Sequence, residues 1–220
     1  MTMPMQWALR RRMMMAGGEG GGGVPISELP LGTLINVRTD GGEGTPNYEI
    51  ADKDNLVSGG VVLVRKDVYS KSYASKSYPD GTLDNLIKTT IYNKMSQQLQ
   101  DKMMDVTFNL ANSGNITRKM FALSHTMVGF GNNNGVAEGK ALQLYTSNDS
   151  RSKTFNGSAA NWWLSSQGSS NYARYIDAGG HGNQSNPSWY SYGVVPAFVI
   201  PGDTLSKLRP NTDGSYNLIL

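Results

Sequence analysis

The chain has 220 residues, enough to bury one sizeable core, but only 38% are hydrophobic and 26 are glycine, so long loops are expected. It has no cysteine, which excludes disulfides and thiolate metal sites, and its two histidines lack the spacing of zinc ligands, so no metal or other cofactor is expected. Much of the net charge of +3 comes from Arg10, Arg11 and Arg12, so the excess of positive charge lies mostly at the start of the chain.

The first 23 residues differ in composition from the rest. Residues 1–15 include MQWALRRRMMM, whose residue types favour a short helix, and residues 16–23 (AGGEGGGG) have the composition of a flexible tether. No apolar run reaches the ~20 residues that span a bilayer, and Met13–Ala16 is too short for the ~7–15-residue core of a signal peptide. We interpret 1–15 as an anchoring segment, 16–23 as a linker and 24–220 as the domain. The alternative is a frayed terminus.

Strand signals come first in the domain, followed by one helical stretch. LGTLINV (31–37), NYEIADKD (47–54) and VVLVRKDVY (61–69) predict strands, the last of them central because it is dense in β-branched residues. In residues 82–106 apolar side chains recur at the spacing of an amphipathic helix, and Ser96 indicates two helices that meet near Met95. We expect this apolar stripe in the core; it consists of Leu83, Leu86, Ile87, Ile91, Met95, Leu99 and Met103.

The second half reads as short strands divided by polar loops. FNL, ITRKMFALS and the alternating ALQLY predict strands, whereas GFGNNNGVAEG (129–139) is a loop that does not complete a dinucleotide-binding motif. NWWLSS and YGVVPAFVI, the two ends of residues 161–200, have core composition, and the tail TDGSYNLIL predicts a last strand. This order of elements predicts an α+β fold.

The two ends of residues 161–200 resemble the closing segments of a family of small bacterial and phage domains with a C-type-lectin-like fold. Members typically carry a Trp-Trp-Leu-Arg-Ser run, a polar segment and a Gly-Val-Arg-Pro-Ala strand, and NWWLSS and YGVVPAFVI match these in order. The resemblance covers about residues 31–201, with Ser165 and Val195 where the family usually has arginine. It implies a C-type-lectin-like domain with short twisted antiparallel sheets, one or two helices and long loops, in which Trp162 and Trp163 pack near the centre.

The polar middle of residues 161–200 is the candidate ligand-binding region. Because its two ends supply the core, its own side chains are free for recognition, and their mixture of Tyr, Trp, Asn and Ser is typical of antibody contact surfaces. Arg174 and Asp177 are the only charged residues there, which argues against a nucleic-acid partner. The candidate binding residues are Asn171, Tyr172, Tyr175, Asp177, His181, Asn183, Asn186, Trp189, Tyr190 and Tyr192.

A structural role is the alternative for three of these residues. His181 lies between glycines, as an exposed turn residue would, and Asp177 precedes Gly179 and Gly180 as a turn former would. Tyr175 can point inward, because alternate residues of a strand face opposite ways.

Catalytic motifs are missing from the sequence. The carboxylates are scattered, no serine occupies a GxSxG elbow, and the Glu-Pro-Asn and Trp-Asn-Asp runs of calcium-dependent lectins do not occur. We therefore expect a protein that is not an enzyme and that binds no calcium.

The resemblance and the first 23 residues together imply a phage structural protein, such as a head fibre, a decoration protein or a tail-tip component. Residues 1–15 would contact other virion proteins, and the domain would bind a host-surface protein or polysaccharide. The chain would be made in the bacterial cytoplasm and end in the virion, with a homo-oligomer as an open option and no membrane insertion. Similar domains are variable proteins of diversity-generating retroelements, whose mutagenesis of adenines reaches the residue types found here. The alternatives are a bacterial cell-surface adhesin and a purely architectural particle protein.

Overall fold

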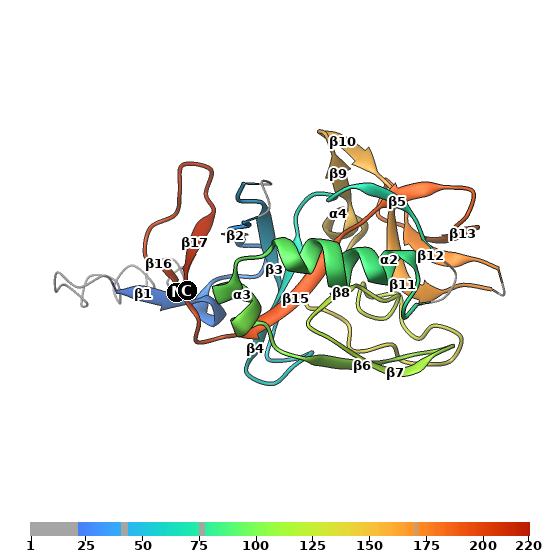
Figure 1. The fold of residues 1–220 in the computed structure, drawn as a ribbon, viewed down its shortest axis with the longest axis horizontal. Helices are drawn as coiled ribbons and strands as arrows, with labels where there is room; N and C mark the ends of the chain where they lie inside the picture. Colours follow the sequence, from blue (N-terminus) through green and yellow to red (C-terminus); the bar gives the residue numbers. More distant parts are fainter. Residues whose placement is uncertain (1–21, 41–43, 75–77, 170) are drawn as a thin grey trace, which may run out of the picture.

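The computed structural model describes residues 22–40, 44–74, 78–169 and 171–220 (Figure 1). Of these residues, 39% lie in strands or bridges and 14% are helical. The protein is therefore mostly β, and the predicted α+β, C-type-lectin-like fold is wrong. The cause lies in the polar second half, where segments that lack hydrophobic periodicity form short strands. The predicted anchoring segment and most of the predicted linker lie outside the described residues, and Gly23 already begins the first strand.

The larger sheet has eight strands in the order β1-β16-β17-β2-β3-β4-β15-β8. They are β1 (Gly23–Pro25), β2 (Leu34–Asn36), β3 (Asn47–Lys53), β4 (Gly60–Arg65), β8 (Met120–Ala122), β15 (Pro196–Pro201), β16 (Leu205–Lys207) and β17 (Tyr216–Ile219). β4 is buried along its whole length between β3 and β15, which explains its uninterrupted apolar run. Its register sets Leu63 opposite Phe198, whose ring packs 5.1 Å from that of Tyr48.

The smaller sheet has five strands in the order β13-β12-β11-β14-β5. They are β5 (Lys71–Tyr73), β11 (Trp162–Gln167), β12 (Ala173–Ile176), β13 (Gly182–Ser185) and β14 (Ser191–Gly193). Two hairpins accompany the sheets: β6 (Val106–Leu110) with β7 (Gly114–Arg118), and β9 (Lys153–Phe155) with β10 (Ser158–Ala160). Along the longest axis of the molecule, β1, β16 and β17 lie at one end and β12 and β13 at the other (Figure 1).

The predicted helical stretch is helical but interrupted. It consists of α2 (Thr82–Asn85), the π-helical turn η2 (Leu86–Ile91), the 3-10 turn η3 (Tyr92–Lys94) and α3 (Gln97–Lys102); the other helical turns are η1 (Ile26–Glu28) and α4 (Asn148–Arg151). The predicted apolar stripe is confirmed as core: Leu86 packs against the core and the other six residues are buried in it. Ser96 does precede α3, but its side chain makes no capping hydrogen bond.

The strand predictions succeed where apolar residues are dense and fail where they are sparse. The predicted central strand and the predicted tail strand are confirmed as β4 and β17, and Trp162 and Trp163 are fully buried in β11. Only Leu34–Asn36 of the predicted strand at 31–37 is extended in the sheet. ALQLY (141–145) forms turns instead of a strand, since its backbone bonds locally and to β3.

Candidate ligand-binding face

The candidate binding residues belong to the five-stranded sheet and its turns. β14 lies parallel beside β11, and it continues on its other side to β5, which is about 120 residues earlier in the chain. β12 and β13 form a hairpin on the opposite side of β11. The polar middle of residues 161–200 therefore folds into three short strands, β12, β13 and β14.

Four aromatic rings form a continuous series on one face of this sheet. The ring of Trp163 packs edge-on against Tyr175 at 5.9 Å and tilted against Tyr192 at 4.6 Å. Tyr175 and Tyr192 are 4.6 Å apart, and Tyr190 stacks on Tyr192 at 5.5 Å with an angle of 19° between the ring planes. We call these four residues, together with Trp189, the aromatic face.

Exposure rises steadily along the aromatic face. Trp163 is fully buried, Tyr175 and Tyr192 are partly buried, Tyr190 is 47% exposed and Trp189 is 71% exposed. Trp163 also donates a hydrogen bond of 2.8 Å from its Nε1 to the carbonyl oxygen of Ser72, on β5. Tyr175 and Tyr192 therefore pack against the ring of Trp163, which belongs to the core.

A tight turn holds Trp189 outward. The Oδ1 of Asn186 accepts hydrogen bonds from the backbone N–H of Ser188 (3.1 Å) and from its hydroxyl (2.7 Å). The N–H of Trp189 donates to the carbonyl of Asn186 at 3.2 Å. Asn186, predicted as a contact residue, thus uses its acceptor within the turn and acts by positioning Trp189.

The hydroxyl of Tyr175 has altered acidity. Burial raises the pKa of Tyr175 to about 12, and the neighbouring hydroxyl of Tyr192 contributes through its charge and through a hydrogen bond. Tyr175 therefore stays a neutral phenol at neutral pH. Its ring packs against Trp163 and Tyr192 but is only partly buried, so the inward orientation applies to it in part.

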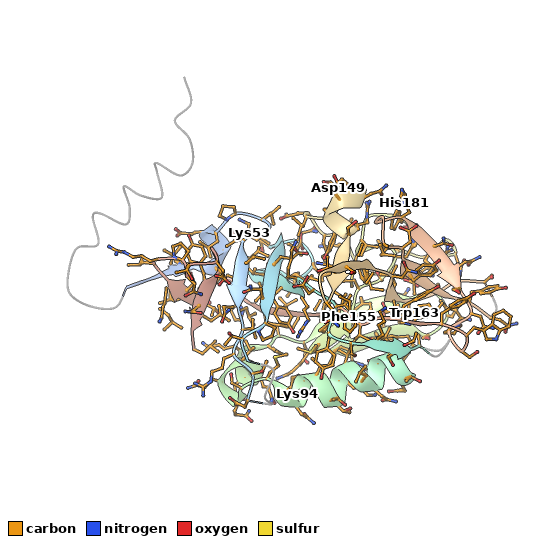
Figure 2. All side chains as sticks on the ribbon, turned by 90° about the horizontal axis from the view of Figure 1, so that it is seen from above. Lys53, Lys94, Asp149, Phe155, Trp163 and His181 are labelled. Atoms are coloured by element: carbon orange, nitrogen blue, oxygen red, sulfur yellow. The ribbon has the colours of Figure 1, made fainter. Side chains whose placement is uncertain are left out.

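Asp177 and His181 form the turn of the β12–β13 hairpin. The Oδ1 of Asp177 accepts hydrogen bonds from the N–H groups of Gly179 (2.9 Å) and His181 (3.0 Å), and it lies 3.2 Å from Nδ1 of His181. Burial acts to raise the pKa of Asp177, but these hydrogen bonds outweigh it and lower the pKa below its usual value. Figure 2 shows His181 on the side of the molecule where α4, marked by Asp149, lies. The turn-forming alternative is the one that the geometry supports for both residues.

The remaining candidates divide between the two sides of the sheet. Asn183 lies opposite Tyr175 in the β12–β13 register and so shares its face, although its Oδ1 accepts the N–H of Gln184. Tyr172 is 40% exposed but belongs to the other side, because its Cβ lies beside Gly168, next to Gln184. Asn171 is exposed in the turn between β11 and β12.

A buried carboxylate that sequence reasoning missed supports the sheet from behind. Glu138 is 1% exposed and accepts hydrogen bonds from the N–H of Ala111 and the Nδ2 of Asn133, both at 3.0 Å, and from the hydroxyl of Ser166 on β11. Asn133 in turn accepts from Nε of Arg174 at 3.2 Å. Glu138 stands alone in the sequence, so no spacing identifies it.

Ion pairs elsewhere in the described residues hold parts of the fold together. Lys153 and Glu49 form a buried ion pair, and burial lowers the pKa of Lys153. A pocket of about 210 Å³ is lined by Lys88, Tyr92, Arg118, Lys119 and Met120, and the cationic groups of Lys88 and Arg118 pair with Asp84. Within the described ranges, no group of three or more His, Asp or Glu side chains is placed to hold a metal ion, and no helix is long and apolar enough to cross a bilayer.

A comparison with known families matches residues 55–202 of the chain to a domain of unknown function, DUF6273. The match runs from the turn before β4 to the end of β15 and includes the whole aromatic face. No curated protein and no solved structure matches the chain.

Proposed function

The chain belongs to the DUF6273 family, and we propose that it is a non-catalytic recognition module that binds its ligand through the aromatic face. The observation that carries this proposal is the exposed ring of Tyr190, which is connected through Tyr192 to the core ring of Trp163, with the more exposed Trp189 next to it in the chain. Water contact with rings of this size is unfavourable, so their joint exposure indicates a surface that a partner covers.

The aromatic face is also held in place before any ligand arrives. β14 pairs with β5 on one side and β11 on the other, and the Asn186 turn fixes the backbone of Trp189. Tyr and Trp side chains have few rotatable bonds, so little conformational entropy is lost when they are covered.

The position of the aromatic face supports the display of this domain on a larger assembly. Gly23, the residue through which the chain enters the sheet, lies in β1, at the opposite end of the molecule from β12 and β13 (Figure 1). A domain attached through the residues before β1 would therefore point its aromatic face outward. We propose a phage particle as the setting, as the sequence resemblance implies; a cell-surface adhesin would use the same geometry.

Binding of the fluorescently labelled protein to a panel of intact bacteria tests the proposal. We expect replacement of both Trp189 and Tyr190 by alanine to weaken binding by about 2 kcal/mol or more, as for buried aromatic hot spots. Tyr172→Ala is the matched control, because it removes a tyrosine of similar exposure from the other side of the same sheet.

Two results would contradict the proposal. One is wild-type binding by the double variant, and the other is an equal loss in Tyr172→Ala. If the double variant instead changes only the sedimentation of the protein or its incorporation into particles, the aromatic face is an assembly contact and the architectural alternative holds.

A further inference from the structure

The charges of the five-stranded sheet are all directed away from the aromatic face. Lys71 and Arg174 are the only charged side chains among the described strand residues of this sheet. Arg174 alternates with Tyr175 along β12 and bonds Asn133 on the other side. Lys71 alternates with Ser72, which pairs with Tyr192, and the ammonium group of Lys71 lies 5.4 Å from the ring centre of Phe155.

The carboxylate of Asp177, which directly follows β12, makes hydrogen bonds within its own turn. The Oδ1 of Asp177 accepts the N–H groups of Gly179 and His181 and lies 3.2 Å from Nδ1 of His181, while the side chain remains 32% exposed. Among the described strand residues of this sheet, no cationic side chain therefore lies on the aromatic face. An acidic ligand would lose its hydration at this surface and gain no opposite charge in return, and the Asp177 carboxylate would repel it.

The polar groups beside the rings are neutral hydrogen-bonding groups. Asn183 lies opposite Tyr175, and Ser185, two residues further along β13, faces the same way. The phenols of Tyr175 and Tyr192 can both donate and accept. The surface thus combines flat ring faces with hydroxyl and amide groups at their edges.

From this combination we infer that the ligand of the aromatic face is an uncharged glycan. The inference rests on the proposed function and narrows it to one class of ligand. The axial C–H groups of a pyranose carry partial positive charge and pack against the electron-rich faces of aromatic rings. The equatorial hydroxyls of the sugar then reach the amides and phenols around the rings.

The stacked pair of Tyr190 and Tyr192 and the projecting Trp189 present more than one ring to the solvent. A ligand that covers them all is therefore longer than one sugar unit. We expect oligosaccharides to bind more tightly than the corresponding monosaccharides, because each further ring contact adds to the affinity.

The test is a printed array of defined neutral and acidic oligosaccharides, followed by titration calorimetry with the neutral oligosaccharide that binds. We expect binding to at least one neutral member, with a dissociation constant that changes less than about twofold between about 50 and 500 mM NaCl. Tyr190→Ala should weaken this binding by about tenfold or more, and Tyr172→Ala should leave it unchanged. The thermal unfolding midpoint of each variant shows that the fold is kept.

Binding to acidic oligosaccharides alone, or to no glycan on the array, overturns the inference. These outcomes are distinguishable from failure of the proposed function. If the labelled protein still binds intact bacteria, and loses that binding when Trp189 and Tyr190 are replaced, recognition stands and only the glycan class is wrong.

Discussion

Several candidate binding residues use their side-chain oxygens to accept hydrogen bonds from the neighbouring backbone. Asp177, Asn183 and Asn186 each accept a hydrogen bond from an N–H group one or more residues further along the chain. Asn and Asp are frequent both in contact loops and in turns, because the same short polar side chain serves either purpose. Composition therefore selects this region as a candidate but does not separate side chains that are available to a ligand from those that shape the backbone.

Tyr175 gives a prediction at the residue scale. The pKa of Tyr175 is about 12 in the folded protein against 10.0 for an ordinary tyrosine, so the unfolded chain loses this proton first as pH rises. The contribution of the neutral phenol to stability is therefore complete below pH 10 and is lost as pH rises toward 12. We expect the free energy of unfolding to fall less steeply above pH 10 in Tyr175→Phe than in the wild type.

Chemical denaturation at a series of pH values from about 9 to 11 measures this slope. The other tyrosines and the lysines titrate in both proteins, so the difference between the two slopes isolates Tyr175. Equal slopes would show that Tyr175 ionises as an ordinary tyrosine does.

At the scale of elements, the strands and helices that bury apolar surface could be predicted from the sequence, and the strands that bury little could not. β3, β4 and the stripe from Leu83 to Met103 carry hydrophobic periodicity because they form the core. β12, β13 and β14 contain Ala-Arg-Tyr-Ile, Gly-Asn-Gln-Ser and Ser-Tyr-Gly, which lack the apolar alternation that marks a strand. Their pairing is set by β11 and β5, which are distant in sequence, so local patterns could not reveal it. The supporting role of Glu138 could not be predicted for the same reason, because its partners Ala111 and Ser166 are distant in the sequence.

Gly180 gives a prediction at this scale. It has a left-handed φ of +83° in the β12–β13 turn, and a Cβ there would lie 1.9 Å from the carbonyl oxygen of Asn148 in α4. Gly157 is the matched control, because it has a φ of +78° in the turn of the β9–β10 hairpin, and a Cβ there would meet nothing within 4 Å. Gly157→Ala should cost about 1 kcal/mol of stability through its conformation alone. Gly180→Ala should cost about 2 kcal/mol more, because the hairpin and α4 must separate.

Thermal and urea unfolding of both variants measure the difference. The binding assay should also show a loss for Gly180→Ala alone, since a displaced hairpin moves Tyr175 relative to Tyr192. Equal destabilisation by the two substitutions would mean that the contact with Asn148 does not position the hairpin.

The whole molecule has two different ends. β12 and β13 of the five-stranded sheet lie at one end, and β1, β16 and β17 lie at the other (Figure 1). The exposed apolar residues Leu205 and Ile219 belong to β16 and β17, and Leu220 follows β17. Gly23 lets β1 approach its partner strand β16 closely, because a Cβ at Gly23 would lie 2.8 Å from the Cβ of Leu205. The proposed attachment end and the sheet proposed for recognition are therefore separated along the longest axis. A domain of this kind can be held at one end without hindering contacts at the other.

This separation gives a prediction about truncation. Among the described residues the sheet is complete from Gly23, where β1 pairs with β16, so removal of residues 1–21 should leave both the unfolding midpoint and the ligand affinity of the aromatic face unchanged. Removal of residues 1–26 takes away β1 and also Ile26, which is fully buried and whose N–H donates to the carbonyl of Thr204 at 2.9 Å. The loss of this one side chain should cost about 3 kcal/mol, and the loss of the strand adds to it. Calorimetric unfolding of the two truncated proteins makes the comparison, with glycan or cell binding as the second measurement. Unfolding of the shorter truncation, or full stability of the longer one, would show that the domain does not begin at β1.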